Sequence, residues 1–211
     1  MSANLMSFAR NGGKFLKLFG DRKMMKLLPY DAEVEYLEST GKKTFISFGL
    51  SSNYDSGVIV MSYDYDFGKR LIVMGSSAKA FAYFELNVAG FWKLANTDST
   101  IACVRGKKTQ IQIYADKAVS VDGENVGSKS NILGAQSPYE CCIFMTGNDI
   151  LGFDANGARC HSVMLEKSGV VVIDAIPVRV GSVGYMFDRV SGQLFGNAST
   201  GAFIIGPDKT T

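Results

Sequence analysis

The chain has 211 residues, of which 46% are hydrophobic, 20% charged and 11% aromatic. This mixture is too apolar for a disordered chain and too polar for a membrane protein, so it predicts a soluble globular protein. Lys and Arg total 22 and Asp and Glu total 20, and this near balance excludes nucleic-acid binding through net charge alone. No apolar run approaches the roughly 18 residues that a membrane-spanning helix needs.

Residues 1–28 form a basic segment with six Lys and Arg against Asp21, a local charge of +5. Its apolar side chains follow helical spacing and are flanked by Lys14 and Lys17; they are Phe15, Leu18, Phe19, Met25 and Leu28. Charges interrupt the segment too often for a secretory signal, so we expect it to be retained. The pattern favours an arm that docks on a partner subunit. A solvated extension and a helix on a membrane surface are the alternatives.

After Pro29 the sequence changes to short alternating or apolar runs separated by Gly, Asn, Asp and Ser, which indicates β-structure. Strands are predicted at 44–50, 56–63, 69–74, 80–86, 99–105, 111–113, 119–121, 140–145, 159–166, 170–177, 183–187 and 202–205. The core face is expected to carry Ile46, Phe48, Ile111, Ile113, Val119 and Val121. About a dozen strands without helices predict an all-β, antiparallel two-sheet jelly-roll sandwich over residues 29–207, followed by a tail at 208–211.

The acidic run Glu33, Glu35 and Glu38 is the sharpest catalytic candidate, because two carboxyl groups on one strand face can hydrolyse a glycosidic bond. The run falls near the start of the β region, on a strand expected to lie outside any cleft, and solvated carboxylates are the preferred interpretation. His161 is the only histidine, and its neighbour Cys160 should point to the opposite face. A cysteine–histidine pair is therefore not expected, and we expect no enzymatic activity.

Four cysteines without a CxxC pair predict reduced thiols in apolar surroundings, not a disulfide scaffold or a zinc site; they are Cys103, Cys141, Cys142 and Cys160. Oxygen ligands at Asp154 and Asn156, before Gly157, leave calcium as an alternative to an ordinary turn. We expect no cofactor and no metal. For glycan binding, the candidates are the aromatic side chains of Tyr63, Tyr65 and Trp92, although core tyrosines with polar tips are the preferred interpretation.

Both ends of the β region carry a resemblance. The run 29–41, PYDAEVEYLESTG, looks like the opening signature of concanavalin A-like (laminin G-like) jelly-roll modules in virion proteins of phages and prophages of gut bacteria. The run 176–201, with GYMFDRVSGQLFGNA at 184–198, is similar to the closing signature of that family. The sequence departs from the pattern at Lys43, Thr44 and Phe45, where the family usually continues with an Asp. The resemblance implies a β-sandwich without a shared catalytic motif, often suspected of glycan binding.

These observations lead to an expectation about function. We expect a bacteriophage virion structural protein, on the head, a fibre or the tail, that is anchored through the arm at 1–28 and exposes its sandwich. Its partners would be other virion proteins and further copies of itself, without nucleic acid or membrane, and it would be assembled in the bacterial cytoplasm. A carbohydrate-binding adhesin that recognises host surface glycans is the alternative.

Overall fold

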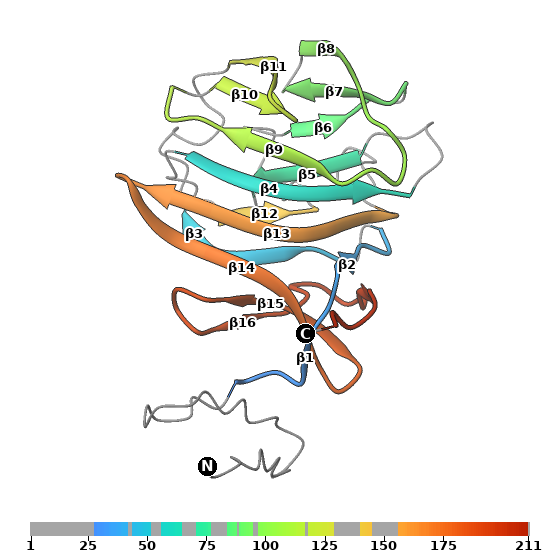
Figure 1. The fold of residues 1–211 in the computed structure, drawn as a ribbon, viewed down its shortest axis with the longest axis vertical. Helices are drawn as coiled ribbons and strands as arrows, with labels where there is room; N and C mark the ends of the chain where they lie inside the picture. The colour runs from blue at the N-terminus through green and yellow to red at the C-terminus, as the bar shows by residue number, and fades with distance from the viewer. Residues whose placement is uncertain are drawn as a thin grey trace, which may run out of the picture.

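A computed structural model describes residues 28–41, 44–51, 56–64, 71–76, 84–87, 89–94, 97–116, 118–128, 140–144 and 156–210. Within these ranges every regular element is a β-strand and all the strand pairs are antiparallel, which confirms the all-β prediction (Figure 1). The described residues contain no helix that could cross a membrane. Apart from Leu28, the predicted N-terminal arm lies outside the described residues.

The strands form two sheets. The larger sheet runs in the spatial order β11 (Glu124–Ser128), β10 (Ala118–Val121), β9 (Thr109–Ile113), β4 (Ser56–Tyr63), β13 (Ala158–Lys167), β14 (Val170–Val180), β15 (Val183–Asp188) and β16 (Leu194–Phe195). Three short strands join it: β1 (Ala32–Glu33) pairs with β14, while β2 (Leu37–Glu38) pairs with β13 and with β17 (Ile204–Ile205). The smaller sheet has the order β3 (Ile46–Ser51), β12 (Glu140–Ile143), β5 (Leu71–Ser76), β6 (Phe84–Leu86), β7 (Phe91–Leu94) and β8 (Thr97–Ala102).

One hydrophobic cluster contains side chains from both sheets. Ring contacts cross between them, since Tyr63 of β4 meets Trp92 of β7 at 5.6 Å and Phe48 of β3 meets Phe195 of β16 at 5.1 Å between centroids. All six predicted core residues are buried in this cluster: Ile46, Phe48, Ile111, Ile113, Val119 and Val121. Period-two alternation therefore identified the inner faces of β3, β9 and β10 correctly.

The two ends of the described chain lie side by side, because β17 pairs with β2 and Val34 forms an isolated bridge with Asp208 (Figure 1). The amide of Gly206 donates to the carbonyl of Tyr36, and the amide of Lys209 donates to the carbonyl of Glu33, both at 2.9 Å. A Cβ atom on residue 206 would lie 2.9 Å from the Tyr36 nitrogen, so the close approach of the two chain ends requires glycine there. Residues 33–36 are thereby fixed on the larger sheet.

The loop that follows β2 also contacts the loop that follows β16. The Asn197 side chain accepts a hydrogen bond from the Phe45 amide at 3.0 Å and donates one to the Gly201 carbonyl at 2.7 Å. The Thr40 hydroxyl donates to the Ala202 carbonyl at 3.1 Å. The contacts of Asn197 with Phe45 and of Thr40 with Ala202 join residues 152 and 162 positions apart, so they hold the loop after β2 against the loop after β16.

A second, smaller hydrophobic cluster contains Tyr30, Ile176, Val178 and Phe187, and Leu28 packs against it. Tyr30 and Phe187 rings meet at 5.0 Å. Leu28, the last residue of the predicted arm, thus lies against the sheet. Its side chain has an intramolecular partner because the alternation of β14 and β15 leaves an apolar strip outside the main core.

Candidate functional site

A row of polar residues crosses the outer face of the larger sheet. Tyr63, at the end of β4, points into the main core, so alternation places Ser62 on the outer face. Ser62 pairs in register with Arg159 of β13, and Arg159 pairs with Glu38 of β2. We call Ser62, Arg159 and Glu38, together with the side chains of Asp64 and Arg105 that continue the chain of ion pairs, the ionic row.

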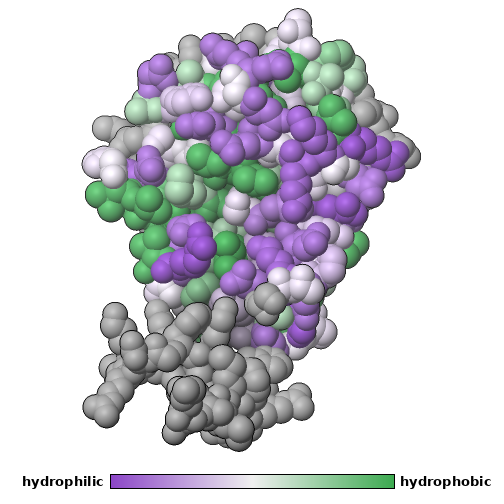
Figure 2. Space-filling model, viewed as in Figure 1, coloured by the Kyte–Doolittle hydropathy of each residue, from purple (hydrophilic) through white to green (hydrophobic). Residues whose placement is uncertain are grey.

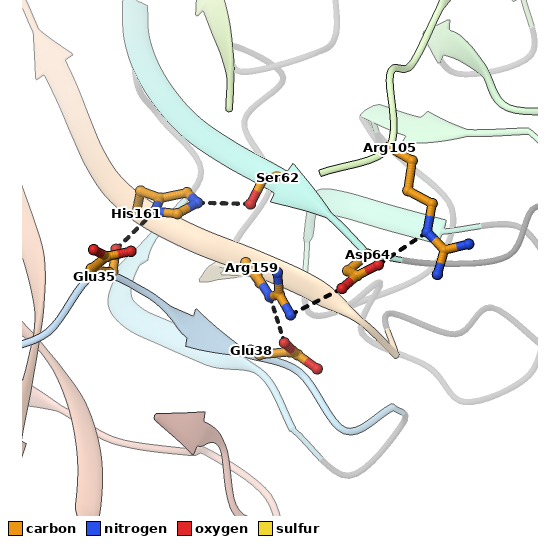
Figure 3. A network of polar contacts seen from close by, with 7 residues as sticks. All are labelled: Glu35, Glu38, Ser62, Asp64, Arg105, Arg159 and His161. Carbon is orange, nitrogen blue, oxygen red and sulfur yellow. Dashed lines mark hydrogen bonds and ion pairs between the residues drawn. The ribbon is translucent and has the colours of Figure 1, made fainter. Parts of the chain in front are cut away.

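Arg159 is the centre of the ionic row (Figure 3). Its Nε donates to a Glu38 carboxylate oxygen at 2.6 Å, and one terminal nitrogen donates to Asp64 at 3.3 Å. The second Asp64 oxygen accepts a hydrogen bond from Arg105 Nε at 3.0 Å. The row thus alternates in charge from Glu38 to Arg159, Asp64 and Arg105. Glu38 is mostly covered, whereas the side chains of Asp64 and Arg105 are 45% and 54% exposed.

Asp64 is ionised over the whole physiological pH range. The hydrogen bond from Arg105 lowers the pKa of Asp64, and the charges of Arg105 and Arg159 lower it further. Two guanidinium groups therefore fix the orientation of a carboxylate that still has solvent-exposed lone pairs.

The ring of Tyr36 lies beneath Arg159 and His161. The guanidinium carbon of Arg159 is 4.6 Å from the ring centroid, and the imidazole of His161 meets the ring edge-on at 5.7 Å between centroids. Gly206 packs against the same ring, where a Cβ would lie 2.9 to 3.0 Å from ring atoms. Tyr36 is therefore clamped between the C-terminal segment and two side chains of β13.

His161 occupies a bulge of β13, where Cys160 pairs with Met61 but Ser162 pairs with Val60. The imidazole Nδ1 bonds the Glu35 carbonyl at 2.7 Å, and Nε2 bonds the Ser62 hydroxyl at 2.8 Å. The carbonyl can only accept, so Nδ1 carries the proton and Nε2 accepts from Ser62 in the neutral ring. Burial lowers the pKa of His161 and is the dominant cause; the hydrogen bond to Glu35 raises it by a smaller amount, and the positive charges of Lys108 and Arg159 lower it.

Two of the glycan-binding candidates lie in the core. Tyr63 and Trp92 have no exposed surface, and the Tyr63 hydroxyl reaches only the sulfur of Met61, at 3.5 Å. A fully covered ring cannot stack on a sugar, so the core interpretation of these two residues is the correct one. Tyr65 lies outside the described residues. Next to the buried Tyr63, it is Asp64 that faces solvent.

The acidic run forms no catalytic pair in the structure. Glu38 is committed to Arg159, Glu33 lies on β1 near Lys209 and accepts a hydrogen bond from Tyr30 at 3.3 Å, and Glu35 follows β1 on the exposed surface. His161 and Cys160 point to opposite faces as predicted, since Cys160 belongs to the main core. The Ser62 hydroxyl does lie beside the His161 imidazole, at 2.8 Å, but both residues are buried, with 3% and 8% of their surface exposed.

The described cysteines Cys103, Cys142 and Cys160 are buried free thiols, as expected. Burial raises the pKa of Cys103 and of Cys160 to about 12, so both remain protonated and unreactive. No group of metal-ligating side chains occurs among the described residues. The calcium alternative at Asp154 falls outside them, although Asn156 and Gly157 form a turn. Arm residues Lys14, Phe15, Lys17, Leu18, Phe19 and Met25 also lie outside the described part.

Sequence reasoning did not single out Arg105, Arg159 or Tyr36 as members of a site. Arg105 lies in a turn before β9, Arg159 lies on β13 and Tyr36 precedes β2, so only strand pairing brings them together. The sequence offered one signal, which is a polar residue in an outward-facing position near one end of each of these strands. That signal locates a site only when the order of the strands in the sheet is known.

The fold resembles a solved structure from Bacteroides ovatus ATCC 8483 that is described as a "putative carbohydrate binding protein". The similarity has a TM-score of 0.57 and a sequence identity of 12% and covers 85% of this chain and 61% of that one, so this chain spans less than two thirds of the length of that protein. No protein-family model matches the chain, and no curated protein matches it in sequence. At this identity the likeness establishes a shared β-rich fold.

Proposed function

We propose that the two sheets form a jelly-roll sandwich of the concanavalin A-like class and that the protein is a non-enzymatic carbohydrate-binding module. The observation that carries this proposal is the exposed Asp64 carboxylate, which Arg105 and Arg159 hold on the open face of the larger sheet. The similarity to the Bacteroides protein, whose description names carbohydrate binding, supports the same class of ligand.

The ionic row suits recognition of sugar hydroxyls. A hydroxyl can donate to an exposed oxygen of Asp64 and accept from a guanidinium group next to it. Because the ion pairs already hold Asp64 and Arg159 in place, less side-chain entropy is lost when the ligand binds. The opposite charges within the row compensate one another, so it does not require a charged ligand.

The experiment is a glycan array followed by calorimetry on the glycans that bind. Asp64→Asn keeps the size of the side chain and removes the negative charge, and it should weaken binding by about tenfold, the loss of one strong hydrogen bond. Asp208→Asn is a matched control, because Asp208 is 50% exposed and pairs with Arg179 at 2.6 Å near the chain ends. Equal affinity of the wild-type and Asp64→Asn proteins would contradict the proposed site, and the absence of any bound glycan would contradict the function.

A second candidate function is the virion structural protein with an assembly arm at 1–28. The observation in its favour is the position of Leu28 against the smaller hydrophobic cluster around Tyr30 and Phe187, which attaches the end of the predicted arm to the sheet. Deletion of residues 1–27 tests it. A variant that folds and binds glycans but no longer incorporates into particles would support the arm, while unchanged incorporation, or flotation of the full-length chain with anionic liposomes, would contradict it.

A further inference from the structure

The outer face of the larger sheet continues beyond the ionic row in two more rows of paired residues. In the middle row, Val60 of β4 pairs with Gln110 of β9 and with Ser162 of β13. In the distal row, Val58 pairs with Gln112 on one side and with Met164 on the other. Gln112 and Met164 continue this row to Ser120 and Asp174.

Apart from the buried Ser120, the residues of these two rows are partly or fully exposed, and Asp174 is the only charged residue among them. Val58, Val60 and Met164 are partly exposed and belong to neither hydrophobic cluster, because their neighbours Ile59, Met61, Val163 and Leu165 take the inner face. Figure 2 shows hydrophobic surface over β4 and β13 beside the hydrophilic surface of the ionic row. Glutamine side chains on β9 border the apolar strip, and each offers both donors and an acceptor.

Tyr114 provides an aromatic ring at the edge of this face. It follows β9 directly, its side chain is directed outward because Ile113 points inward, and 39% of its surface is exposed. Its hydroxyl lies 3.1 Å from the Ser120 hydroxyl, which fixes the ring against the distal row. Unlike Tyr63 and Trp92, this ring can stack on a sugar.

We infer that the two rows and Tyr114 form an extended site for a linear, uncharged glycan that crosses the strands and reaches the ionic row. This inference rests on the proposed carbohydrate-binding function and names its ligand as an internal stretch of chain rather than a single terminal sugar. Neighbouring strands lie about 4.8 Å apart, close to the length of one sugar unit, so successive units would meet β9, β4 and β13 in turn. Each strand there offers an apolar contact or an amide.

The composition of the face favours a glycan over a second copy of the chain. Apolar side chains on β4 alternate with hydrogen-bonding groups on β9 within each row, which matches the apolar and hydroxyl-bearing surfaces of a sugar ring. The face also adjoins the ionic row without interruption, since Ser62, Val60 and Val58 are successive outward positions of β4. A single ligand can therefore contact all three rows.

The test measures affinity by calorimetry for a glycan from the array as a series from the monosaccharide to the hexasaccharide. Affinity should rise by about tenfold or more between one and four units and then level off. Tyr114→Ala and Val60→Arg should remove this gain while leaving monosaccharide affinity unchanged. The control is Val183→Arg, because Val183 is 50% exposed at the hairpin between β14 and β15 and lies outside the face.

Affinity that does not depend on length would overturn the extended site but leave the proposed function in place, provided that Asp64→Asn still weakens binding. Unchanged binding of the hexasaccharide by Tyr114→Ala and Val60→Arg would overturn it as well. A wild-type dimer in sedimentation that becomes a monomer on Val60→Arg substitution would show that a second copy covers this face, and that too would overturn the inference. Failure of every glycan to bind would remove both proposals.

Discussion

Arg159 and Tyr36 are stacked, with the guanidinium carbon 4.6 Å from the centre of the ring, while the same guanidinium bonds Glu38 and Asp64. One side chain therefore joins β13, the segment before β2 and the end of β4. This arrangement depends on the planar shape of the guanidinium group as well as on its charge.

Arg159→Lys keeps the charge but loses the planar fork and the stacking contact. We expect unfolding free energy to fall by about 1 to 2 kcal/mol and glycan affinity to fall with it, because Asp64 loses one of its two supports. Chemical denaturation and calorimetry measure the two effects. Arg105→Lys is the comparison, since Arg105 is more exposed and should affect stability much less. Equal stability of the Arg159→Lys and wild-type proteins would contradict this account.

Asp188 is a buried carboxylate that organises the closing segment. It accepts hydrogen bonds from the Asp174, Val190 and Ser191 amides and from the Ser191 hydroxyl, at 2.6 to 3.2 Å. Asp188→Asn places an amide donor against these donors and should destabilise the fold by about 2 to 3 kcal/mol in denaturant unfolding. Asp116→Asn, in the exposed turn before β10, is the control and should change little. A small effect at Asp188 would mean that water satisfies these groups.

Stability should fall in mild acid through His161. Its pKa is below the ordinary value of about 6.5 in the folded state, so the unfolded chain binds more protons between these two values. The stability that neutral His161 adds to the folded state is fully present above pH 6.5, and it is lost as the pH falls from there toward the pKa that His161 has in the folded protein. His161 is the only histidine, so thermal melts of the His161→Gln variant should lack this decline. If the His161→Gln variant lost the same amount of thermal stability in mild acid, the prediction would be wrong and carboxylates would be the cause.

An introduced charge should lower stability strongly on the inner face of β9 and only slightly on its outer face. Ile113→Asp buries an unpaired carboxylate in the main core and should cost about 3 kcal/mol or more, enough to prevent folding in many domains. Gln112→Asp places the same group one residue away on the outer face and should change stability by less than about 0.5 kcal/mol. Denaturant unfolding followed by circular dichroism measures the stability of the two variants. Similar losses of stability at both positions would contradict the assignment of Ile113 to the inner face and Gln112 to the outer face of β9.

Alternation was sufficient to predict the long strands, and the predicted span 56–63 coincides with β4. It missed β7 at Phe91–Leu94, because buried Lys93 between Trp92 and Leu94 removes the apolar–polar contrast. It also missed the two-residue strands β1, β2 and β16, which are too short to show a period. The ionic row could not be predicted from the sequence for a different reason. Its residues become neighbours only because strands that are distant in sequence pair with one another.

The paired ends of the described chain have a mechanical consequence. Residues 33–36 and 206–209 run in opposite directions and are hydrogen-bonded across, so a pull on both ends would load these bonds one after another instead of all at once. Glu38 would leave Arg159 early in such an event, because it lies on β2 beside β17. Single-molecule pulling from the two ends should accordingly open the fold at lower force than pulling from the turns at Gly106 and Gly169.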